Sequence, residues 1–390
     1  MPIVYVLLSP TFGMHQYTAD LANRTADSRF ETSPPDVQKM EDGLRATVVT
    51  TTAFPRDRYS PAVQIHTPIS GRTTGFGREG LDLVAYRRLQ SVIFNLQSST
   101  SRSQSTIFHF TGVHAWNLPL VYALRRRGAP VIHTLHDLDP HAGVRFAGLI
   151  RLWNRLILAS GCRILVHGRR YRDRLLAQGL PPGRVTFAPL LHGFWGYAAE
   201  YQAAAARTQF SPAQPRHVIF FGRLAWYKGI DTLLAAWALL SAADAGANPA
   251  WPHRLILAGS VAHDLALPAL PAGVELRNQR IPDAEGIELF RRAALLVLPY
   301  RDATQSALVA TAYRFGVPVI VTRTGALPEA VIEGETGWVI PPNDPPALAH
   351  ALREALSDSD RLAAMGAAGR AWFDQQRRHE EEVLSTLYLA

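Results

Sequence analysis

The sequence predicts an α/β protein of two doubly wound, Rossmann-like parallel-sheet domains that face each other across a cleft. Its length of 390 residues exceeds that of an ordinary domain with a single hydrophobic core and suits two domains of roughly 150–200 residues each. Short apolar runs alternate with helical patterns in both halves, which is typical of parallel sheets with crossover helices. The alternation stops once, at residues 193–215, and starts again at Val218. Ligands of such sheets bind at the carboxyl ends of the strands.

Six strands and four helices are expected in the first half. The predicted strands are Ile3–Leu8, Ala46–Thr51, Thr106–Phe110, Val131–Leu135, Ile164–His167 and Val185–Ala188. The predicted helices are Gln16–Arg24, Asn117–Arg126, Arg145–Ala159 and Arg169–Gln178. Residues 55–105 have no clear pattern and stay partly unassigned. Residues 196–215 lack the strand pattern and end in prolines. This indicates a linker there, after an N-terminal domain of residues 1–195.

The second half repeats the alternation over residues 216–375. Strands are expected at Val218–Phe221, Leu255–Ala258, Val274–Leu276, Leu295–Leu298, Val319–Thr322 and Trp338–Ile340. Helices are expected at Ile230–Leu240, at Pro346–Leu356 and from Asp360 to the end. We expect the last segment, residues 376–390, to pack back on the N-terminal domain.

Bulk composition narrows the class of protein. An apolar fraction of 47% with 18% charged residues indicates a globular chain. The opening "MPIVYVLLSP" predicts a first strand rather than a signal peptide, and no apolar run is long enough for a transmembrane helix. The single cysteine, Cys162, excludes an internal disulfide and a cysteine-based zinc site. A cytoplasmic location follows as the expectation.

The net charge of +8 is concentrated in the first half, where residues 101–200 carry 13 Lys and Arg against 4 Asp and Glu. A basic face suggests an anionic partner, or else reflects the codon usage of a GC-rich genome. No nucleic-acid-binding module is visible. From Gly143 onward one helical stripe holds six apolar residues, with Arg145, Arg151 and Arg155 off it: Phe146, Leu149, Ile150, Trp153, Leu156 and Ile157. It predicts either contact with the inner face of a membrane or an ordinary buried face.

The stretch "FFGRLAWYKGIDTLL" (220–234) is the strongest candidate for chemistry. A strand ends at Gly222, and Arg223 and Lys228 follow before Gly229 opens a helix. Glycine allows the backbone to approach a ligand, and the two cations could neutralise a diphosphate. The alternative is a solvated turn with two surface cations.

In motif order, the segment 216–357 resembles the retaining glycosyltransferases of the GT-B fold, known as group 1 or family 4. The resemblance begins with Gly-Arg-x4-Lys-Gly after a strand and continues with "LILAGS" and "VELRNQRIPDAEGIELFRRAALLVLPY". It ends with "FGVPVIVTRTGALPEAVIEGETGWVIPPNDPPALAHAL". The N-terminal half is similar more loosely, through "VYVLLSPTFGMHQYTADLA" and "HAWNLPLVYALRRRGAPVIHTLHDLDPHAG".

The resemblance implies roles for residues of the N-terminal half. His136 would lie near the transferring sugar, although a strand-end histidine can also simply cap a loop. Asp137 and His141 would orient loops or touch the acceptor, and Gly13 would be the loop glycine against which the donor phosphates lie. A zinc site of His133, His136, Asp137 and His141 is the other interpretation, but this family transfers sugars without a metal, so neither metal nor cofactor is expected.

Further roles carry over to the C-terminal half. Gly222, Arg223 and Lys228 would hold the diphosphate, and backbone groups near Arg280 and Ile281 would hold the nucleobase. The family's two glutamates are absent, because their positions hold Ala303 and Thr311. The loop "ATQSALVATAYRFG" (303–316) still offers neutral donors and small side chains. The expected contacts are Thr304, Gln305 and Ser306 with the sugar, the N–H groups of Ser306, Ala307 and Leu308 with phosphate, and Thr311 weakly with ribose.

The expected function is retaining transfer of a hexosyl unit from a nucleotide-diphosphate sugar to a glycan or lipid-linked acceptor, in the synthesis of cell-surface polysaccharide or glycoconjugates. Two alternatives remain. One is a sugar phosphorylase, for which the chain lacks the length and the cofactor-lysine segment. The other is a catalytically weak nucleotide-sugar-binding partner subunit, which the missing glutamates suggest.

Overall fold

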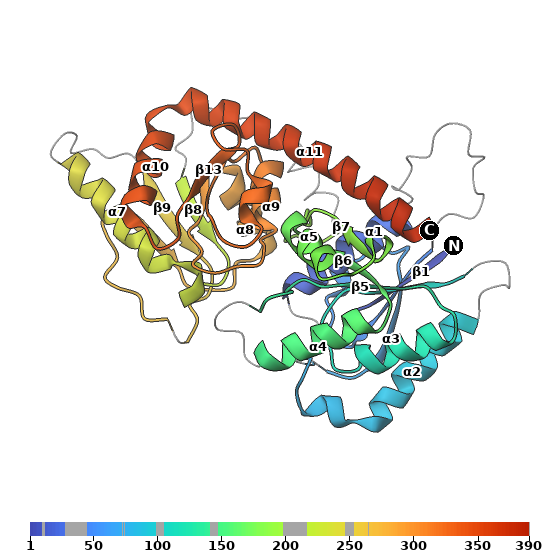
Figure 1. Cartoon of the computed structure of the whole chain (residues 1–390). Helices are drawn as coiled ribbons and strands as arrows, with labels where there is room; N and C mark the ends of the chain where they lie inside the picture. The colour runs from blue at the N-terminus through green and yellow to red at the C-terminus, as the bar shows by residue number, and fades with distance from the viewer. Residues whose placement is uncertain are drawn as a thin grey trace. The chain divides into compact units, whose positions relative to one another are not determined.

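The computed structural model describes residues 1–9, 12–27, 45–71, 73, 75–98, 105–140, 147–197, 217–245, 253–263 and 265–389 (Figure 1). The chain forms two compact units. Unit 1 holds residues 1–140, 145–198 and 378–390, and unit 2 holds residues 141–144 and 199–377. The long last helix therefore contributes its final residues to unit 1. The linker predicted at residues 196–215 lies outside the described residues from residue 198 onward.

Unit 1 is built on a seven-stranded sheet in the order β3-β2-β1-β4-β5-β6-β7. All of its strand pairs are parallel; for example, Ile3 of β1 lies between Ala46 of β2 and Ile107 of β4. The strands are β1 (Pro2–Val6), β2 (Arg45–Thr51), β3 (Gln64–Ile69), β4 (Ile107–Phe110), β5 (Val131–Thr134), β6 (Arg163–Val166) and β7 (Val185–Phe187). The side chains of the five inner strands are almost all buried, as expected of a parallel sheet, whereas the edge strands β3 and β7 are only partly buried.

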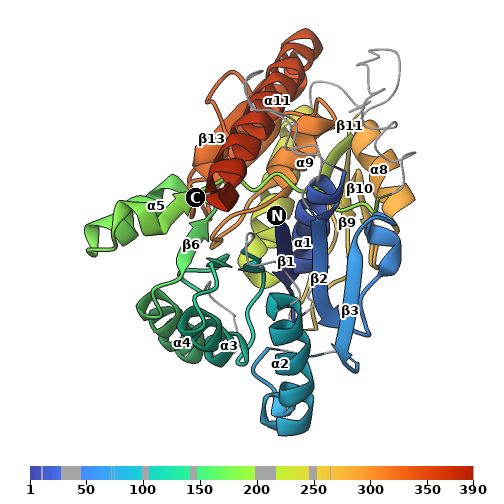
Figure 2. The same cartoon turned by 90° about the vertical axis from the view of Figure 1, so that its right-hand side faces the viewer.

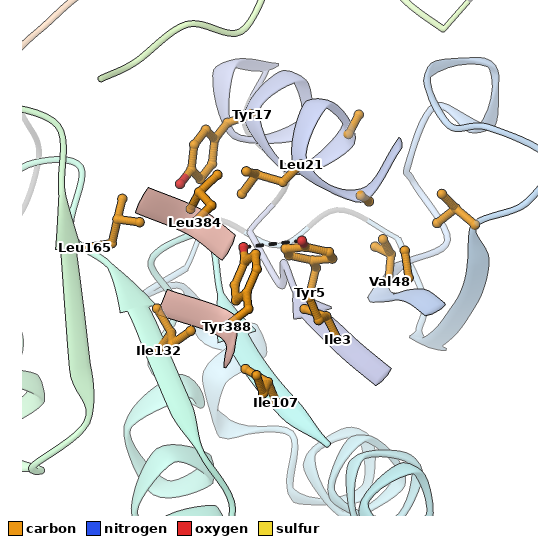
Figure 3. Close-up of a cluster of buried hydrophobic side chains, with 14 of the residues drawn as sticks. Ile3, Tyr5, Tyr17, Leu21, Val48, Ile107, Ile132, Leu165, Leu384 and Tyr388 are labelled. Carbon is orange, nitrogen blue, oxygen red and sulfur yellow. Dashed lines mark hydrogen bonds between the residues drawn. The ribbon is translucent and has the colours of Figure 1, made fainter. Parts of the chain in front are cut away.

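Helices cover both faces of this sheet (Figures 1 and 2). One layer consists of α2 (Leu83–Ser98), α3 (Asn117–Arg126) and α4 (Ala147–Ala159). On the other face, α1 (Phe12–Ala26) and the end of α11 (Ser359–Leu389) pack against Tyr5 and its neighbours (Figure 3). Helix α5 (Arg169–Ala177) connects β6 to β7.

Buried polar groups fix the end of α11 in unit 1. The Tyr388 hydroxyl lies 2.9 Å from Nδ1 of His109 and 3.3 Å from the Tyr5 hydroxyl (Figure 3). On the same helix, the Glu380 carboxylate lies 3.1 Å from the guanidinium of Arg24 in α1, and both side chains are buried. Since buried polar groups are stable only when paired, these contacts make residues 380–388 an integral part of the unit 1 core.

Unit 2 has a six-stranded parallel sheet in the order β10-β9-β8-β11-β12-β13. Its strands are β8 (His217–Phe221), β9 (Arg254–Ala258), β10 (Val274–Arg277), β11 (Ala293–Leu298), β12 (Val319–Thr322) and β13 (Gly337–Ile340). Its helices are α7 (Ile230–Ala245), α8 (Asp283–Arg291), α9 (Leu308–Arg314), α10 (Pro345–Ser357) and the first part of α11. The strand order reverses between β8 and β11, and this reversal is the switch point at which doubly wound sheets bind ligands.

The predicted class of two Rossmann-like parallel-sheet α/β domains is confirmed, and each predicted strand exists within two residues of its expected ends. The sequence missed β3 and α2, both in the unassigned residues 55–105. Strand β3 is an edge strand whose sequence "QIHTPI" is mostly only half-buried, so it carries no buried run. Helix α2 buries only Leu89 and Ile93 fully, so its apolar stripe is too narrow to stand out.

Candidate donor site at the switch point of unit 2

Glycines bring the loops after β8, β9 and β11 into backbone contact. Gly229 has φ 65°, and a Cβ on it would lie 2.0 Å from the carbonyl oxygen of Pro299. Gly259 has φ 152°, and a Cβ there would lie 2.0 Å from the carbonyl oxygen of Gly222. Only glycine fits both the backbone conformation and the space at these two positions. The glycines at these two positions of the motif thus have a steric cause within unit 2.

Two cations lie at this switch point without a carboxylate between them. Arg223 is exposed, and Lys228 is partly buried with its ammonium donating to the Tyr300 hydroxyl at 2.8 Å. The Lys228 ammonium also lies 4.2 Å from the centre of the Tyr300 ring. Neither cation forms an ion pair with any residue that the structure describes. Their positive charge is therefore available to an anionic ligand.

The surroundings of Lys228 keep it charged. Burial alone would lower the pKa of its ammonium, but the interactions with Tyr300 and Tyr227 outweigh burial and raise the pKa. Hydrogen bonding to the charged form and contact with an aromatic face both favour the cation. Lys228 is thus a fixed positive charge at neutral pH.

The loop of residues 303–308 lies against the same motif. A Cβ on Gly325, whose φ is 50°, would lie 1.8 Å from the carbonyl oxygen of Ala303. The Ala326 N–H donates to the carbonyl oxygen of Thr304 at 2.8 Å. The Leu308 side chain lies 3.9 Å from the place of a Cβ on Gly222. The structure therefore brings the predicted donor residues Gly222 and Leu308 side by side.

Within this loop the predicted contacts differ in accessibility. Thr304 and Thr311 are buried, whereas Gln305, Ser306, Ala307 and Leu308 are partly exposed. Helix α9 has only seven residues, and its first N–H, that of Leu308, already lies 3.4 Å from Oγ of Ser306 as donor. The Leu308 N–H is therefore already engaged locally, whereas Arg223 and Lys228 form no ion pair with a described residue.

The structure adds a group that the sequence did not single out. The Arg301 guanidinium stacks 4.9 Å from the centre of the Trp226 ring, donates to Asn343 Oδ1 at 2.6 Å and pairs with Asp231. Trp226 is 53% exposed, and Asn343 has φ 58°. Arg301 thus ties together the loops after β8, β11 and β13. The available signal was its position directly after the Pro-Tyr strand end.

The predicted base-binding residues follow β10, at the same carboxyl edge of the sheet. Arg277 pairs with Glu275 at 2.7 Å and with Glu285 at 2.9 Å. Asn278 Oδ1 accepts from the Val261 N–H at 2.8 Å, which joins this loop to the one after β9. Arg280 is exposed and Ile281 is 9% exposed. The predicted base and diphosphate residues therefore share one edge of unit 2.

In unit 1, His136 belongs to a buried group of aromatic rings beyond β5, β6 and β7. Its Nε2–H donates to the carbonyl oxygen of Thr111 at 3.1 Å. Its ring centre lies 4.9 Å from that of Tyr17 and 5.1 Å from that of His167. Nδ1 of His167 donates to the carbonyl oxygen of Ala188 at 2.9 Å, and its Nε2 has no hydrogen-bond partner in the described part of the chain. His167 is a histidine that the sequence reasoning missed.

Among the remaining predicted residues of unit 1, the structure describes the surroundings of Gly13, Asp137 and His133. The expectation that Gly13 is a loop glycine is wrong, because it lies in the first turn of α1, where nothing lies within 4 Å of a Cβ. The Asp137 carbonyl oxygen accepts from Asn154 at 2.9 Å. His141 lies outside the described residues. His133 packs between Phe110 and Trp153, away from the ring contacts of His136.

The described residues contain no group of three or more His, Cys, Asp or Glu side chains that could hold a metal ion. The zinc interpretation therefore gains no support from the described part of the chain. Among the residues that the structure describes, no helix is both long and apolar enough to span a membrane.

Buried histidines predict a dependence of unit 1 stability on pH. Burial lowers the pKa of His133, His136 and His167 to about 3 from the usual 6.5. Between pH 6.5 and about pH 3, these histidines are protonated in the unfolded chain but neutral in the folded chain. Their contribution to stability is therefore fully present above pH 6.5 and decreases as the pH falls below it. We expect each such histidine to cost about 2 kcal/mol between pH 7 and pH 5. Thermal unfolding at the two values measures this.

A matched pair of variants isolates the histidines. His133→Gln should flatten the dependence on pH, and His350→Gln, at an exposed position, should leave it unchanged. Equal stability of the wild-type protein at pH 7 and pH 5 would show that the imidazoles do not control it.

Two Rossmann-like parallel-sheet units in one chain agree with the GT-B architecture, and comparison with known families identifies the class of enzyme. The family described as "Glycosyl transferases group 1" matches residues 215–358, and "Glycosyl transferase 4-like domain" matches residues 12–190. The chain belongs to this family of glycosyltransferases, and it is an enzyme of that class.

Individual relatives agree with this assignment. A D-inositol 3-phosphate glycosyltransferase of Thermobispora bispora is 26% identical over 379 residues, covering 91% of this chain and 84% of the relative. Sucrose-phosphate synthase of Thermosynechococcus elongatus has a TM-score of 0.69 at 19% identity, covering 100% of this chain and 98% of its own. Anabaena HepE, solved with UDP-glucose, has a TM-score of 0.68 at 15% identity over 100% of both chains. The two solved structures show that the fold is shared.

Proposed function

We propose that this glycosyltransferase moves a hexosyl unit from a nucleotide-diphosphate sugar to a glycan or lipid-linked acceptor with retention of configuration, in cell-surface polysaccharide or glycoconjugate synthesis. The observation that carries the proposal is the pair Arg223 and Lys228 at the switch point of unit 2, with no carboxylate partner in the described residues. A diphosphate is the ligand that two such cations neutralise. The similarity to a D-inositol 3-phosphate glycosyltransferase and to HepE, which was solved with UDP-glucose, agrees with it.

The proposed chemistry places the two cations on the leaving group. As the bond between the sugar and the diphosphate breaks, negative charge grows on the phosphate, and Arg223 and Lys228 stabilise it. Because the leaving phosphate can itself deprotonate the acceptor on the same face of the sugar, configuration is retained without an enzymic nucleophile. The absence of any Asp or Glu between Asp302 and Glu329 fits a reaction that needs positive rather than negative groups.

The remaining donor contacts are proposed for neutral groups. Thr304, Gln305 and Ser306 would bind the sugar, and backbone groups near Arg280 and Ile281 would bind the base. Ala303 and Thr311 stand where the family's acids would be, so a carboxylate does not hold the ribose hydroxyls. Asp137 and the loop after β5 would contact the acceptor.

The alternative is a partner subunit that binds a nucleotide sugar without transferring it, and one experiment separates the two. Thermal unfolding is measured with UDP, GDP and ADP and with the matching sugar nucleotides, and turnover of each sugar nucleotide is measured in parallel. A donor at 100 times its Kd should stabilise the protein by about 2.7 kcal/mol. Stabilisation without hydrolysis or transfer would support the binding subunit. No stabilisation by any nucleotide would contradict both functions.

The role proposed for His136 predicts a specific loss. His136→Asn keeps a donor for the Thr111 carbonyl but removes the imidazole near the sugar, so the rate of transfer should fall about 10²-fold. The melting temperature and the affinity of unit 2 for the nucleotide should stay close to those of the wild-type protein. Transfer rates and nucleotide-induced thermal shifts are the measurements. His350→Ala is the control at an exposed histidine, and an unchanged rate for His136→Asn would assign it a capping role only.

A further inference from the structure

Helices α2, α3 and α4 form one continuous layer on unit 1 (Figures 1 and 2). Phe76, just before α2, packs against Trp153 of α4 with ring centres 6.3 Å apart. Arg127, at the end of α3, donates to Gln97 of α2 at 2.8 Å. The Tyr122 hydroxyl of α3 donates to a carbonyl oxygen of α4 at 3.5 Å. We call the outer surface of this layer the α2–α4 face.

The α2–α4 face exposes two groups of large apolar side chains. On α4, Leu149, Leu152 and Leu156 are 44%, 52% and 40% exposed. Around the start of α2, Leu81, Leu83 and Val84 are 81%, 69% and 62% exposed. The structure corrects the predicted stripe of α4 here, because Trp153 and Ile157 are buried and Leu152, which was outside that stripe, is the most exposed. Soluble proteins expose single leucines routinely, but grouped ones mark interaction sites.

The same face is strongly basic. Eight exposed arginines belong to the segments that form this layer: Arg78, Arg87, Arg88, Arg125, Arg126, Arg127, Arg151 and Arg155. Its helical segments, residues 78–98, 117–127 and 147–159, contain only two acids, Glu79 and Asp82. Asp82 is occupied in capping α2, since its carboxylate accepts from the N–H groups of Val84 and Ala85 at 3.0 and 2.9 Å. The face therefore has a large positive excess beside its apolar groups.

On α4, the helical spacing places exposed leucines and exposed arginines next to each other. Residues 149, 152 and 156 follow the i, i+3, i+7 spacing of one helical stripe, and Arg151 and Arg155 lie on the adjoining side. On α2, Arg87 and Arg88 lie one turn after Leu83 and Val84. Leucines that can enter an acyl layer, flanked by arginines that can reach phosphates, are typical of helices that lie in a membrane interface.

We propose that the α2–α4 face binds the surface of an anionic lipid bilayer. The arginines pair with anionic headgroups and the six apolar side chains enter the boundary between headgroups and acyl chains. A nucleic acid would satisfy the arginines but leave the leucines in water. A second copy of this chain would bring the same positive face against itself in a two-fold dimer, and like charges oppose that contact. Charge and apolar character together favour the bilayer.

The test is co-sedimentation of the whole protein with vesicles of phosphatidylcholine and phosphatidylglycerol, and with vesicles of phosphatidylcholine alone. We expect binding to the anionic vesicles, weaker binding at high salt, and little binding to the neutral ones. Leu149→Gln with Leu152→Gln should lower partitioning at least tenfold, and Arg151→Gln should lower it about fivefold. The assay contains no donor or acceptor, so its result does not depend on the proposed reaction.

Matched controls use positions of unit 2. Leu239→Gln on α7, at a leucine 48% exposed, and Arg353→Gln, at an exposed arginine of α10, should leave partitioning unchanged. Equal melting temperatures show that all variants are folded. Failure of the wild-type protein to bind anionic vesicles at low salt would overturn the proposal. So would binding that the leucine variants retain in full, or a dimer in solution that Leu152→Gln dissociates.

Discussion

Replacing Lys228 with alanine is expected to lower the rate of glycosyl transfer by about 10²–10³-fold, or 2.7–4 kcal/mol of transition-state stabilisation. The ammonium is a fixed charge held by Tyr300 at the switch point of unit 2. If it stabilises the departing diphosphate, its interaction is stronger in the transition state than with the bound donor. The loss should therefore appear mainly in kcat and less in the KM for the donor.

Three further variants make the Lys228 experiment specific. Arg223→Ala should also lower kcat, because Arg223 is the second cation of the pair. Tyr300→Phe removes the hydrogen bond to Lys228 but keeps the ring, so we expect a smaller loss than for Lys228→Ala. Arg353→Ala, at an exposed arginine of α10, is the control and should have wild-type kinetics. Rates near the wild-type value for both Lys228→Ala and Arg223→Ala would contradict the assigned donor site.

Replacing Glu380 with alanine is expected to lower the free energy of unfolding of unit 1 by about 3–5 kcal/mol. The Glu380 carboxylate lies 3.1 Å from the Arg24 guanidinium, and both side chains are buried. Removing Glu380 leaves Arg24 with carboxylate contacts to Asp20 at 3.1 Å and Glu381 at 3.8 Å, so its buried charge is compensated less fully. Hydrogen exchange of the β1 amides, which reports on unit 1 alone, measures the change.

Two variants control for the position and the charge. Glu382→Gln removes an exposed carboxylate from the same helix and should change stability by less than about 0.5 kcal/mol. The double variant Arg24→Met with Glu380→Leu removes both charges and should recover most of the loss. A loss below about 1 kcal/mol for Glu380→Ala would show that the pair does not hold the end of α11 in unit 1.

Sequence periodicity was sufficient for the central strands, because a strand buried on both faces has a continuous apolar run such as "AALLVL" in β11. It was insufficient at the edge, where β3 is only partly buried, and for α2, which buries few residues. The donor motif could also be recognised from the sequence, because its residues are close together along the chain. Gly222, Arg223, Lys228 and Gly229 lie within eight residues, so their chemistry could be inferred from one short segment.

Residues of the site that depend on distant partners could not be predicted. Arg301 became part of the site only through Trp226, Asp231 and Asn343, which are far from Arg301 in the sequence. His167 joined His136 because β5 and β6 are neighbours in the sheet. On α4, periodicity placed Leu149, Trp153 and Leu156 on one stripe, but packing against the sheet buried Trp153 and left the leucines exposed.

The sequence by itself determined the two α/β units, the family and the cationic motif, because each depends on local spacing along the chain. The tertiary structure alone decided which side chains of α2 and α4 remain exposed beside arginines. It also decided that Lys228 meets Tyr300 and that Arg24 is paired in the core by a glutamate near the other end of the chain. These features depend on contacts between distant segments, and burial and pairing are properties of the packed structure, not of the pattern of residues.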